Sequence, residues 1–327
     1  MATSGPPAWR SPDLTIRVGI SSCLLGEQVR YDGGHQKDAY LADVLARHVS
    51  WVPVCPEMEV GMGVPREPVR LVDTAGALRM LGVTSGTDHT APMNELGRRR
   101  VRDLARHGLH GYILKRGSPS CGMERVKLYT ETGAMSRTGV GLFARVLIEG
   151  LPLLPVEEEG RLNDARLRDN FITRVFAYRR LVALRESEPR PRDVVAFHAA
   201  HESLLLAHSP SAQARLGRQV AEIADHPRGP WLERYAEGFM RALESPATRG
   251  KHVNALQHLA GLFERRLSAA EKRELLGVID DYARGLAPLV VPITLINHYV
   301  ARFDVGDVRD QIYLRPHPKE LMLRNHV

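Results

Sequence analysis

The sequence predicts an α/β fold, with a Rossmann-like parallel-sheet domain followed by an all-α domain. Short β-rich segments alternate with helix-like segments up to residue 156, and strands separated by helices of this length are typical of a parallel, doubly wound sheet. From Asp164 onward, apolar residues recur at helical spacing with few β-rich runs. We therefore expect domains at 14–157 and 161–327, preceded by a flexible polar tail at 1–13.

The elements of the first domain follow from local patterns. Strands are predicted at 14–20, 51–54, 111–114 and 151–156, and a hairpin is predicted from 69–72 and 78–83 around Ala75 and Gly76. Helices are predicted at 38–48, 91–107 and 140–148. The run Glu157–Gly160 interrupts this pattern and marks the expected domain boundary.

The second domain is predicted to consist of helices. They cover 166–186, 192–207, 211–225, 231–244, 251–262 and 269–285. The longest strongly apolar stretch, 287–296, contains two prolines and is much shorter than the roughly 20 apolar residues of a membrane span. Residues 1–10 lack the apolar segment of a secretory signal, so we expect a cytoplasmic protein without a membrane partner.

Composition and charge narrow the class of protein. The chain has 327 residues, of which 43% are hydrophobic and 25% charged, which excludes a largely disordered, collagen-like or disulfide-scaffold protein. The net charge of +7 permits a nucleic-acid partner without requiring one. Residues 98–127 hold nine basic and two acidic side chains, with Arg99 and Arg102 expected on one helix face. Such a run is either a solvated helix face or a surface that holds phosphates.

Cysteine placement is the most informative feature. The three cysteines are Cys23, Cys55 and Cys121, and no two are separated by only two residues, which excludes a self-contained zinc finger. Each follows a predicted strand. Because ligands bind beyond the carboxyl ends of strands in open parallel sheets, we expect the three thiols at one edge. The alternative is that all three are buried and inert.

Three thiolates around a pocket would suit zinc, copper(I) or an iron–sulfur cluster. Structural zinc normally takes four protein ligands, whereas a [4Fe–4S] cluster on three cysteines leaves one iron open to act as a Lewis acid. Glu57 lies two residues after Cys55 and is either a general acid or base, or a loop charge. Ser118 and Ser120 bring hydroxyls near Cys121, although serine is also common in turns.

Three segments resemble the thiouracil desulfurase (desulfidase) family, namely SSCLLGEQVRYDGG (21–34), PVCPEMEVGMGVPREPVRL (53–71) and LKRGSPSCG (114–122). The resemblance implies a [4Fe–4S] cluster on Cys23, Cys55 and Cys121 with one open iron. It also implies that Glu57 is the acid or base and that Ser118 positions substrate. The expected substrate or RNA contacts are Arg30, Tyr31, Arg66, Arg99, Arg102 and Lys115.

The second half resembles a helical domain that is fused to this desulfidase domain. The segments are FHAAHESLLLAHSP, GKHVNALQHLAGLF, VPITLINHYV and YLRPHPKELMLRN. The fusion resembles bacterial tRNA 4-thiouridine desulfidases, in which the helical domain would help to bind RNA. The resemblance thus implies non-redox, hydrolytic removal of sulfur from 4-thiouridine in tRNA, with Glu57 deprotonating the attacking water.

Two other functions stay open at this point. The chain could act only on free thiouracil or thionucleosides, or it could be a non-catalytic RNA-binding protein whose thiols bind zinc or sense redox state.

Some residues of the second half also allow two interpretations. His198 and His201 could bind a metal ion, but core or surface hydrogen bonds are the expected role of the histidines, including His252, His258 and His298. The aromatic residues Trp231, Tyr282, Tyr299 and Tyr313 could stack on bases or fill the core.

Overall fold

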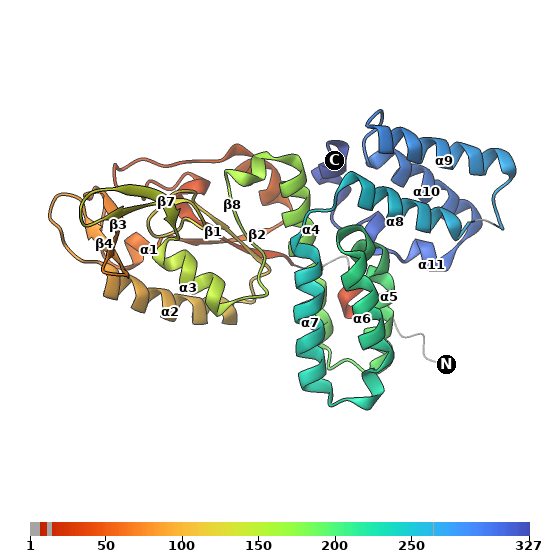
Figure 1. The fold of residues 1–327 in the computed structure, drawn as a ribbon, viewed down its shortest axis with the longest axis horizontal. Helices are drawn as coiled ribbons and strands as arrows, with labels where there is room; N and C mark the ends of the chain where they lie inside the picture. Colours follow the sequence, from red (N-terminus) through yellow and green to blue (C-terminus); the bar gives the residue numbers. More distant parts are fainter. Residues whose placement is uncertain (1–6, 12–14, 264) are drawn as a thin grey trace. The chain divides into compact units, whose positions relative to one another are not determined.

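The structure is a computed structural model that describes residues 7–11, 15–263 and 265–327. The chain divides into two compact units. One unit is Thr15–Asn163, and the other contains Asp164–Val327 together with the described part of the N-terminal segment. Figure 1 shows the strands in the first unit and the long helices in the second.

The first unit is built on the predicted parallel sheet. Its strands are β1 (Arg17–Ser21), β2 (Ser50–Val54), β5 (Gly111–Leu114) and β8 (Val156–Glu158), in the order β2-β1-β5-β8. All three pairings are parallel, with Val18 opposite both Trp51 and Gly111. All four residues of β5 are buried, as expected for a central strand covered on both faces. The carboxyl ends of these strands therefore share one edge.

Two of the three α-helices of the first unit occur close to predicted positions, whereas the four-residue helix at 56–59 was not predicted. The helices are α1 (Pro56–Glu59), α2 (Thr90–Arg106) and α3 (Leu142–Gly150), with helical turns at η2 (Ser22–Leu25), η3 (Tyr40–Val44), η4 (Leu45–Arg47) and η5 (Arg161–Asn163). Helix α2 buries Met93, Leu96, Val101 and Leu104 and packs against α3, so its arginines lie on the opposite, solvated side. The predicted helix at 38–48 is formed as the two short turns η3 and η4.

A second sheet in this unit was only half predicted. Strands β3 (Val69–Thr74) and β4 (Ala77–Gly82) form the expected antiparallel hairpin, with Ala75 at φ 51° and Gly76 at φ 83°. Positive φ at both central residues is typical of a two-residue hairpin turn. The hairpin of β6 (Val126–Thr130) and β7 (Met135–Gly139) was missed, because four of the five residues of β7 are exposed and give no apolar pattern.

The first unit extends past the predicted boundary at Glu157–Gly160, to Asn163. Strand β8 overlaps the expected strand 151–156 only at Val156, and it continues through Glu157 and Glu158, which are buried. These carboxylates have partners in the same unit: Glu157 accepts a hydrogen bond from Arg161 Nε at 2.6 Å, and Glu158 accepts one from the Met123 amide at 2.7 Å. Burial of charge is tolerated when it is paired and hydrogen-bonded, so three adjacent glutamates do not end the domain here.

The second unit is helical, as predicted. Its helices are α4 (Ala165–Glu186), α5 (Pro191–His208), α6 (Pro210–Ala221), α7 (Arg228–Glu244), α8 (Arg249–Gly261), α9 (Ala269–Arg284), α10 (Val290–Phe303) and α11 (Gly306–Arg309), with turns at η6 (Ile223–Asp225), η7 (Ile312–Leu314), η8 (Lys319–Leu321) and η9 (Leu323–Asn325). Helix α10 was not predicted because of Pro292. That proline lies in the first turn, where the backbone N–H groups have no partner inside the helix.

The N-terminal segment differs from the flexible tail expected for residues 1–13. Residues Ala8–Arg10 form the turn η1, and Trp9 is buried in the helical unit. Its ring centroid lies 5.2 Å from that of Phe197 and 5.8 Å from that of His201, and Arg10 forms an ion pair with Asp310 at 2.8 Å. The tail prediction is therefore wrong for this turn, while residues 1–6 and 12–14 lie outside the described residues.

The aromatic residues and the paired histidines of the helical unit belong to its core. Trp231, Tyr282, Tyr299 and Tyr313 are all at most 2% exposed, so they are not available for stacking on bases. His198 Nδ1 lies 3.2 Å from the Tyr235 hydroxyl, and His201 Nδ1 lies 2.7 Å from the Phe197 carbonyl oxygen. Among the helices that the structure describes, none is long and apolar enough to cross a membrane.

Candidate active site

The three cysteines line one cavity at the carboxyl edge of the parallel sheet. Cys23 lies in η2 after β1, Cys55 follows β2 directly, and Cys121 lies in the loop after β5. The cavity has a volume of about 270 Å³. Its lining also contains Arg30, Tyr31, Glu57, Arg66, Lys115 and Ser118. The fold thus brings together most of the side chains that the sequence singled out.

Local sequence explains how the thiols are presented. Gly26 ends η2 with φ 99°, a conformation that L side chains rarely adopt. Pro56 occupies the first position of α1, where its fixed φ suits a helix start. In the third loop, a Cβ at Gly122 would lie 2.9 Å from the Ser118 carbonyl oxygen, and one at Gly141 would lie 2.4 Å from the Ser120 carbonyl oxygen. The loop that carries Cys121 therefore requires glycine at both positions.

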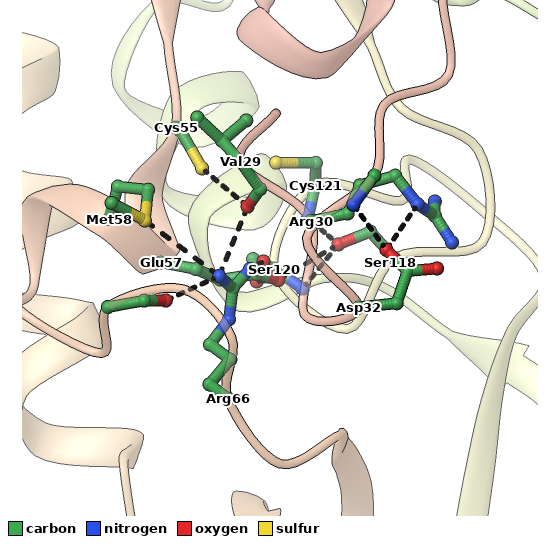
Figure 2. A network of polar contacts seen from close by, with 12 residues as sticks. Val29, Arg30, Asp32, Cys55, Glu57, Met58, Arg66, Ser118, Ser120 and Cys121 are labelled. Atoms are coloured by element: carbon green, nitrogen blue, oxygen red, sulfur yellow. Dashed lines mark hydrogen bonds and ion pairs between the residues drawn. The ribbon is translucent and has the colours of Figure 1, made fainter. Parts of the chain in front are cut away.

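Glu57 is the centre of a polar network at this cavity (Figure 2). Its Oε2 forms an ion pair with Arg66, and its Oε1 accepts a hydrogen bond from the Ser120 hydroxyl. The Ser118 hydroxyl lies 3.4 Å from the same Oε1. Both carboxylate oxygens are thus held by side chains from other segments, and this fixes the orientation of Glu57 toward the cavity.

The two serines have different places in this network. Ser118 Oγ accepts hydrogen bonds from the amides of Ser120 and Cys121, each at 3.2 Å, so it shapes the turn as well as lining the cavity. Ser120 is fully buried, and its hydroxyl donates to Glu57. The sequence predicted a role in positioning substrate for Ser118 only. The contact between Ser120 and Glu57 joins two segments that are distant in the sequence. Neither segment contains a sequence motif that would predict it.

Arg66 was expected to contact substrate, but the structure shows its guanidinium occupied within the protein. Besides the ion pair with Glu57, Nη1 donates to the carbonyl oxygens of Val29 at 3.1 Å and Gly63 at 2.8 Å. Planar guanidinium groups suit such fixed, multiple contacts better than lysine does. The geometry therefore gives Arg66 a positioning role toward Glu57.

Lys115 also has a partner that the sequence analysis missed. Its Nζ forms an ion pair with Glu159, whose Oε2 accepts a hydrogen bond from the Arg116 amide at 2.7 Å. The Lys115 amide donates to Ser21 Oγ at 3.0 Å, which ties the end of β5 to the end of β1. Glu159, which was assigned to a domain boundary, thus holds a segment of the cavity wall.

Two of the expected contacts lie in the loop after η2. The Arg30 guanidinium lies 5.6 Å from the centre of the Tyr31 ring and 3.5 Å from Asp32. Tyr31 remains 42% exposed. Both Arg30 and Tyr31 line the cavity, so a cation and an aromatic ring are available to a bound base.

Burial dominates the electrostatics of the thiols. It raises the pKa of Cys23 to about 11, and it also raises the pKa of Cys55 and, most strongly, of Cys121. Nearby cations oppose this effect, with Lys115 lowering the pKa of Cys23 and Arg66 that of Cys55. Without a metal the thiols are protonated at neutral pH, and metal binding would release their protons.

The donor set of the cavity fits an iron–sulfur cluster. Within the residues that the structure describes, no three His, Cys, Asp or Glu side chains converge closely enough to hold one metal ion. A zinc ion needs its ligands to meet at one point, whereas a four-iron cluster accepts each thiolate at a different iron. Three soft sulfur donors around one cavity satisfy the second requirement.

The predicted RNA contacts on α2 are separate from the cavity. Arg99 and Arg102 are exposed, do not line the cavity, and form no ion pair with another described residue. Their neighbour Arg100 points toward Glu59, with Nε 3.2 Å from its carboxylate. The outer face of α2 therefore presents two solvent-exposed cations that a phosphate group could contact.

Comparison with known proteins gives a separate result for each half of the chain. Residues 18–159 match the family model of 2-thiouracil desulfurase, and residues 203–318 match a family of unknown function, DUF1722. The chain is 29% identical over 165 residues to the uncharacterized protein YbgA of Escherichia coli K12, covering 50% of this chain and 98% of that protein. It is 29% identical over 150 residues to the uncharacterized protein YbbK of Bacillus subtilis 168, covering 44% of this chain and 97% of that protein. A solved structure titled [4Fe-4S]-dependent thiouracil desulfidase TudS is 28% identical and covers 47% of this chain and 97% of its own, with a TM-score of 0.38.

Proposed function

We propose that this chain, whose residues 18–159 match the family model of 2-thiouracil desulfurase, is an iron–sulfur-dependent desulfidase that removes sulfur from 4-thiouridine in tRNA. One observation carries the proposal: three thiols from the ends of three parallel strands share a cavity of about 270 Å³ with the carboxylate of Glu57. Soft metal ligands beside a positioned proton acceptor suit cleavage of a carbon–sulfur bond.

Cys23, Cys55 and Cys121 would hold a [4Fe–4S] cluster with one iron open. When bound, such a cluster would supply a soft Lewis acid for the sulfur of a thiocarbonyl group. The other groups of the cavity are placed to bind the base. Tyr31 offers a ring face, and Lys115 offers a cation that Glu159 holds in place.

Glu57 would take the proton from the attacking water. Water oxygen bonds to the carbon, the carbon–sulfur bond breaks, and the products are the carbonyl base and hydrogen sulfide, so no electrons are gained or lost overall. Arg66 and Ser120 hold the carboxylate in one orientation during this transfer. Ser118, which lines the cavity 3.4 Å from Glu57, is placed to orient the water or the base.

The cavity is large enough for a base but too small for the rest of a tRNA. A volume of about 270 Å³, part of which the cluster would fill, is slightly below the range of about 300–1,000 Å³ for small-molecule sites, so it leaves no room for more of the RNA than the base. Contacts with the rest of a tRNA must lie outside it. The exposed arginines of α2 supply such contacts, and the helical unit would add others.

Metal analysis and one conservative variant test the catalytic part. Protein purified anaerobically should hold about four irons per chain with matching acid-labile sulfide, and Cys121→Ala should lose them. Glu57→Gln should keep the iron but lower turnover of 4-thiouridine by about 10²–10⁴-fold, the scale for loss of a general base. Glu59→Gln is the matched control, because it changes the same helix outside the cavity. Zinc in place of iron, or unchanged turnover in Glu57→Gln, would contradict the proposal.

A charge reversal tests the tRNA substrate. Arg99→Glu with Arg102→Glu should weaken tRNA binding and its salt dependence, since each neutralised phosphate releases counterions. Turnover of free 4-thiouridine should be nearly unchanged. If both substrates are processed as before, the chain acts on free bases or nucleosides, or its RNA contacts lie on other elements.

A further inference from the structure

A second cavity lies in the helical unit, far along the chain from the cysteines. Its volume is about 510 Å³, and it is formed by the first half of α10 and the segment 314–325. The lining residues that matter for its chemistry are Ile293, Asn297, Arg315, Lys319, Leu323 and Arg324. No aspartate or glutamate is among its lining residues. The lining of the cavity thus combines apolar side chains with three cations and contains no carboxylate.

Arg324 is the unusual member of this lining. It is only 7% exposed, and its Nη1 donates to the backbone carbonyl oxygen of Tyr313. Its Nε has no hydrogen-bond partner among the described residues, and no ion pair in that part of the chain includes it. The Arg324 guanidinium also lies 4.9 Å from the centre of the Tyr313 ring, which offsets part of the cost of its burial, and an anion that enters the cavity would offset more of it.

The nearest buried carboxylate is already engaged. Asp169 accepts a hydrogen bond from His317 Nε2 at 3.0 Å. Burial alone would raise the pKa of Asp169, but the hydrogen bond from His317 and the charge of Arg324 lower it to about 2. Asp169 therefore stays charged and offsets part of the positive charge of Arg324 without forming an ion pair with it.

The remaining cations lie where a ligand could reach them. Arg315 and Lys319 are both exposed, and the hydrogen bond of the Arg315 side chain to Asn297 Oδ1 is a long one, 3.5 Å. Three cations and no carboxylate in the lining favour a dianion, such as a phosphate monoester, over a carboxylate or an internal phosphodiester, which carry one charge each. The apolar wall, which includes Ile293 and Leu323, gives the organic part of such a ligand a surface to pack against.

We propose that this cavity binds a nucleotide through its terminal phosphate monoester, with Arg324 at the floor and Arg315 and Lys319 at the opening. The nucleotide is either a free 5′-mononucleotide or the 5′-phosphorylated end of an RNA strand. This site does not depend on the desulfidase function proposed above, because it shares no residue with the cysteine cavity.

Calorimetric titration of the full chain with uridine 5′-monophosphate and with uridine tests the proposal. The monophosphate should bind about tenfold or more tightly than uridine, since charge-assisted hydrogen bonds are worth about 1.5–3 kcal/mol. Arg315→Gln with Lys319→Gln should weaken binding of the monophosphate by a similar factor. Lys272→Gln with Arg273→Gln, which removes the same charges from the exposed face of α9, should leave it unchanged.

Oligouridylates with and without a 5′-phosphate identify the source of the ligand. Competition with the monophosphate by the 5′-phosphorylated strand alone supports an RNA end, and binding of the monophosphate alone supports a free nucleotide. Equal affinities for uridine and its monophosphate, equal effects of the two double variants, or no binding at all would overturn the proposal. None of these readouts uses desulfidation or iron, so failure here is distinguishable from failure of the proposed function.

Discussion

Replacing Arg66 by Met tests whether an internal ion pair holds the candidate active site together. The Arg66 side chain is 5% exposed and that of Glu57 is 18% exposed. Met retains most of the apolar stem but removes the charge opposite Glu57 and the N–H groups that reach the carbonyl oxygens of Val29 and Gly63. The variant therefore leaves a half-buried carboxylate and two carbonyl groups without their partner.

The expected loss is large because the pair is shielded from water. Removing one partner of a buried ion pair costs about 3–5 kcal/mol, so Arg66→Met should lower the free energy of unfolding of the first unit by about that amount. The matched control is Arg79→Met in the same unit. Arg79 and its partner Asp88 are 49% and 39% exposed, and exposed pairs contribute about 0–1 kcal/mol.

Hydrogen exchange resolved by segment measures the two losses, since it reports opening within residues 15–163 separately from the helical unit. Equal losses for Arg66→Met and Arg79→Met would refute the role of the buried pair. Arg66→Lys then separates positioning from substrate binding. It keeps the charge but not the planar fork, so kcat should fall about tenfold with KM nearly unchanged. A raised KM with unchanged kcat would instead make Arg66 the substrate contact that the sequence predicted.

Three further predictions concern an ion pair, a buried tryptophan and two buried histidines. Glu159→Gln removes the charge that fixes Lys115, so kcat/KM for a thionucleoside should fall about tenfold, and unchanged kinetics would contradict the contact. Trp9→Ala should destabilise the helical unit by about 3–5 kcal/mol, measured by hydrogen exchange. An unchanged stability would instead support the flexible tail that the sequence predicts. Burial lowers the pKa of His208 to about 4 and of His252 to about 3, below the ordinary 6.5, so the unfolded chain binds protons first on acidification. The helical unit should therefore be most stable above pH 6.5 and lose about 1.4 kcal/mol per pH unit for each histidine as the pH falls toward 4; a pH series of unfolding measurements on the wild type and a double Gln variant checks this slope.

The sequence was sufficient to place the three cysteines because their positions depend on local patterns and one topological rule. The β-rich runs before Cys23, Cys55 and Cys121 are recognisable from composition, and parallel strands end at the same edge. Helix α2 was predicted almost to the residue, since its apolar side chains recur with the period of a helix. Elements whose own residues show a β-rich run or a regular spacing of apolar side chains could thus be predicted.

Contacts between distant segments could not be predicted. Neither the motif around Glu57 nor the one around Ser120 shows that these side chains meet, and the pairing of Lys115 with Glu159 joins residues on different strands. The burial of Glu158 was missed for the same reason, because a glutamate is expected at the surface unless a partner is known. Exposed strands such as β7 fail differently, since their side chains carry no apolar alternation.

At the end of β8, the extent of the first domain determines the geometry of its candidate active site. β8 is parallel to β5, with Leu114 opposite Glu158, so both strands end at the edge where the cysteines lie. Glu158 holds the Met123 amide and Glu159 holds the Arg116 amide, on either side of the loop that carries Cys121. A domain ended at residue 157, the boundary that the sequence suggested, would lack both carboxylates and leave that loop without its two outer supports. A domain ended at Asn163 keeps them, and it also keeps Arg161, which neutralises the neighbouring Glu157. The glutamates that look like a linker are therefore part of the frame that presents the third thiol.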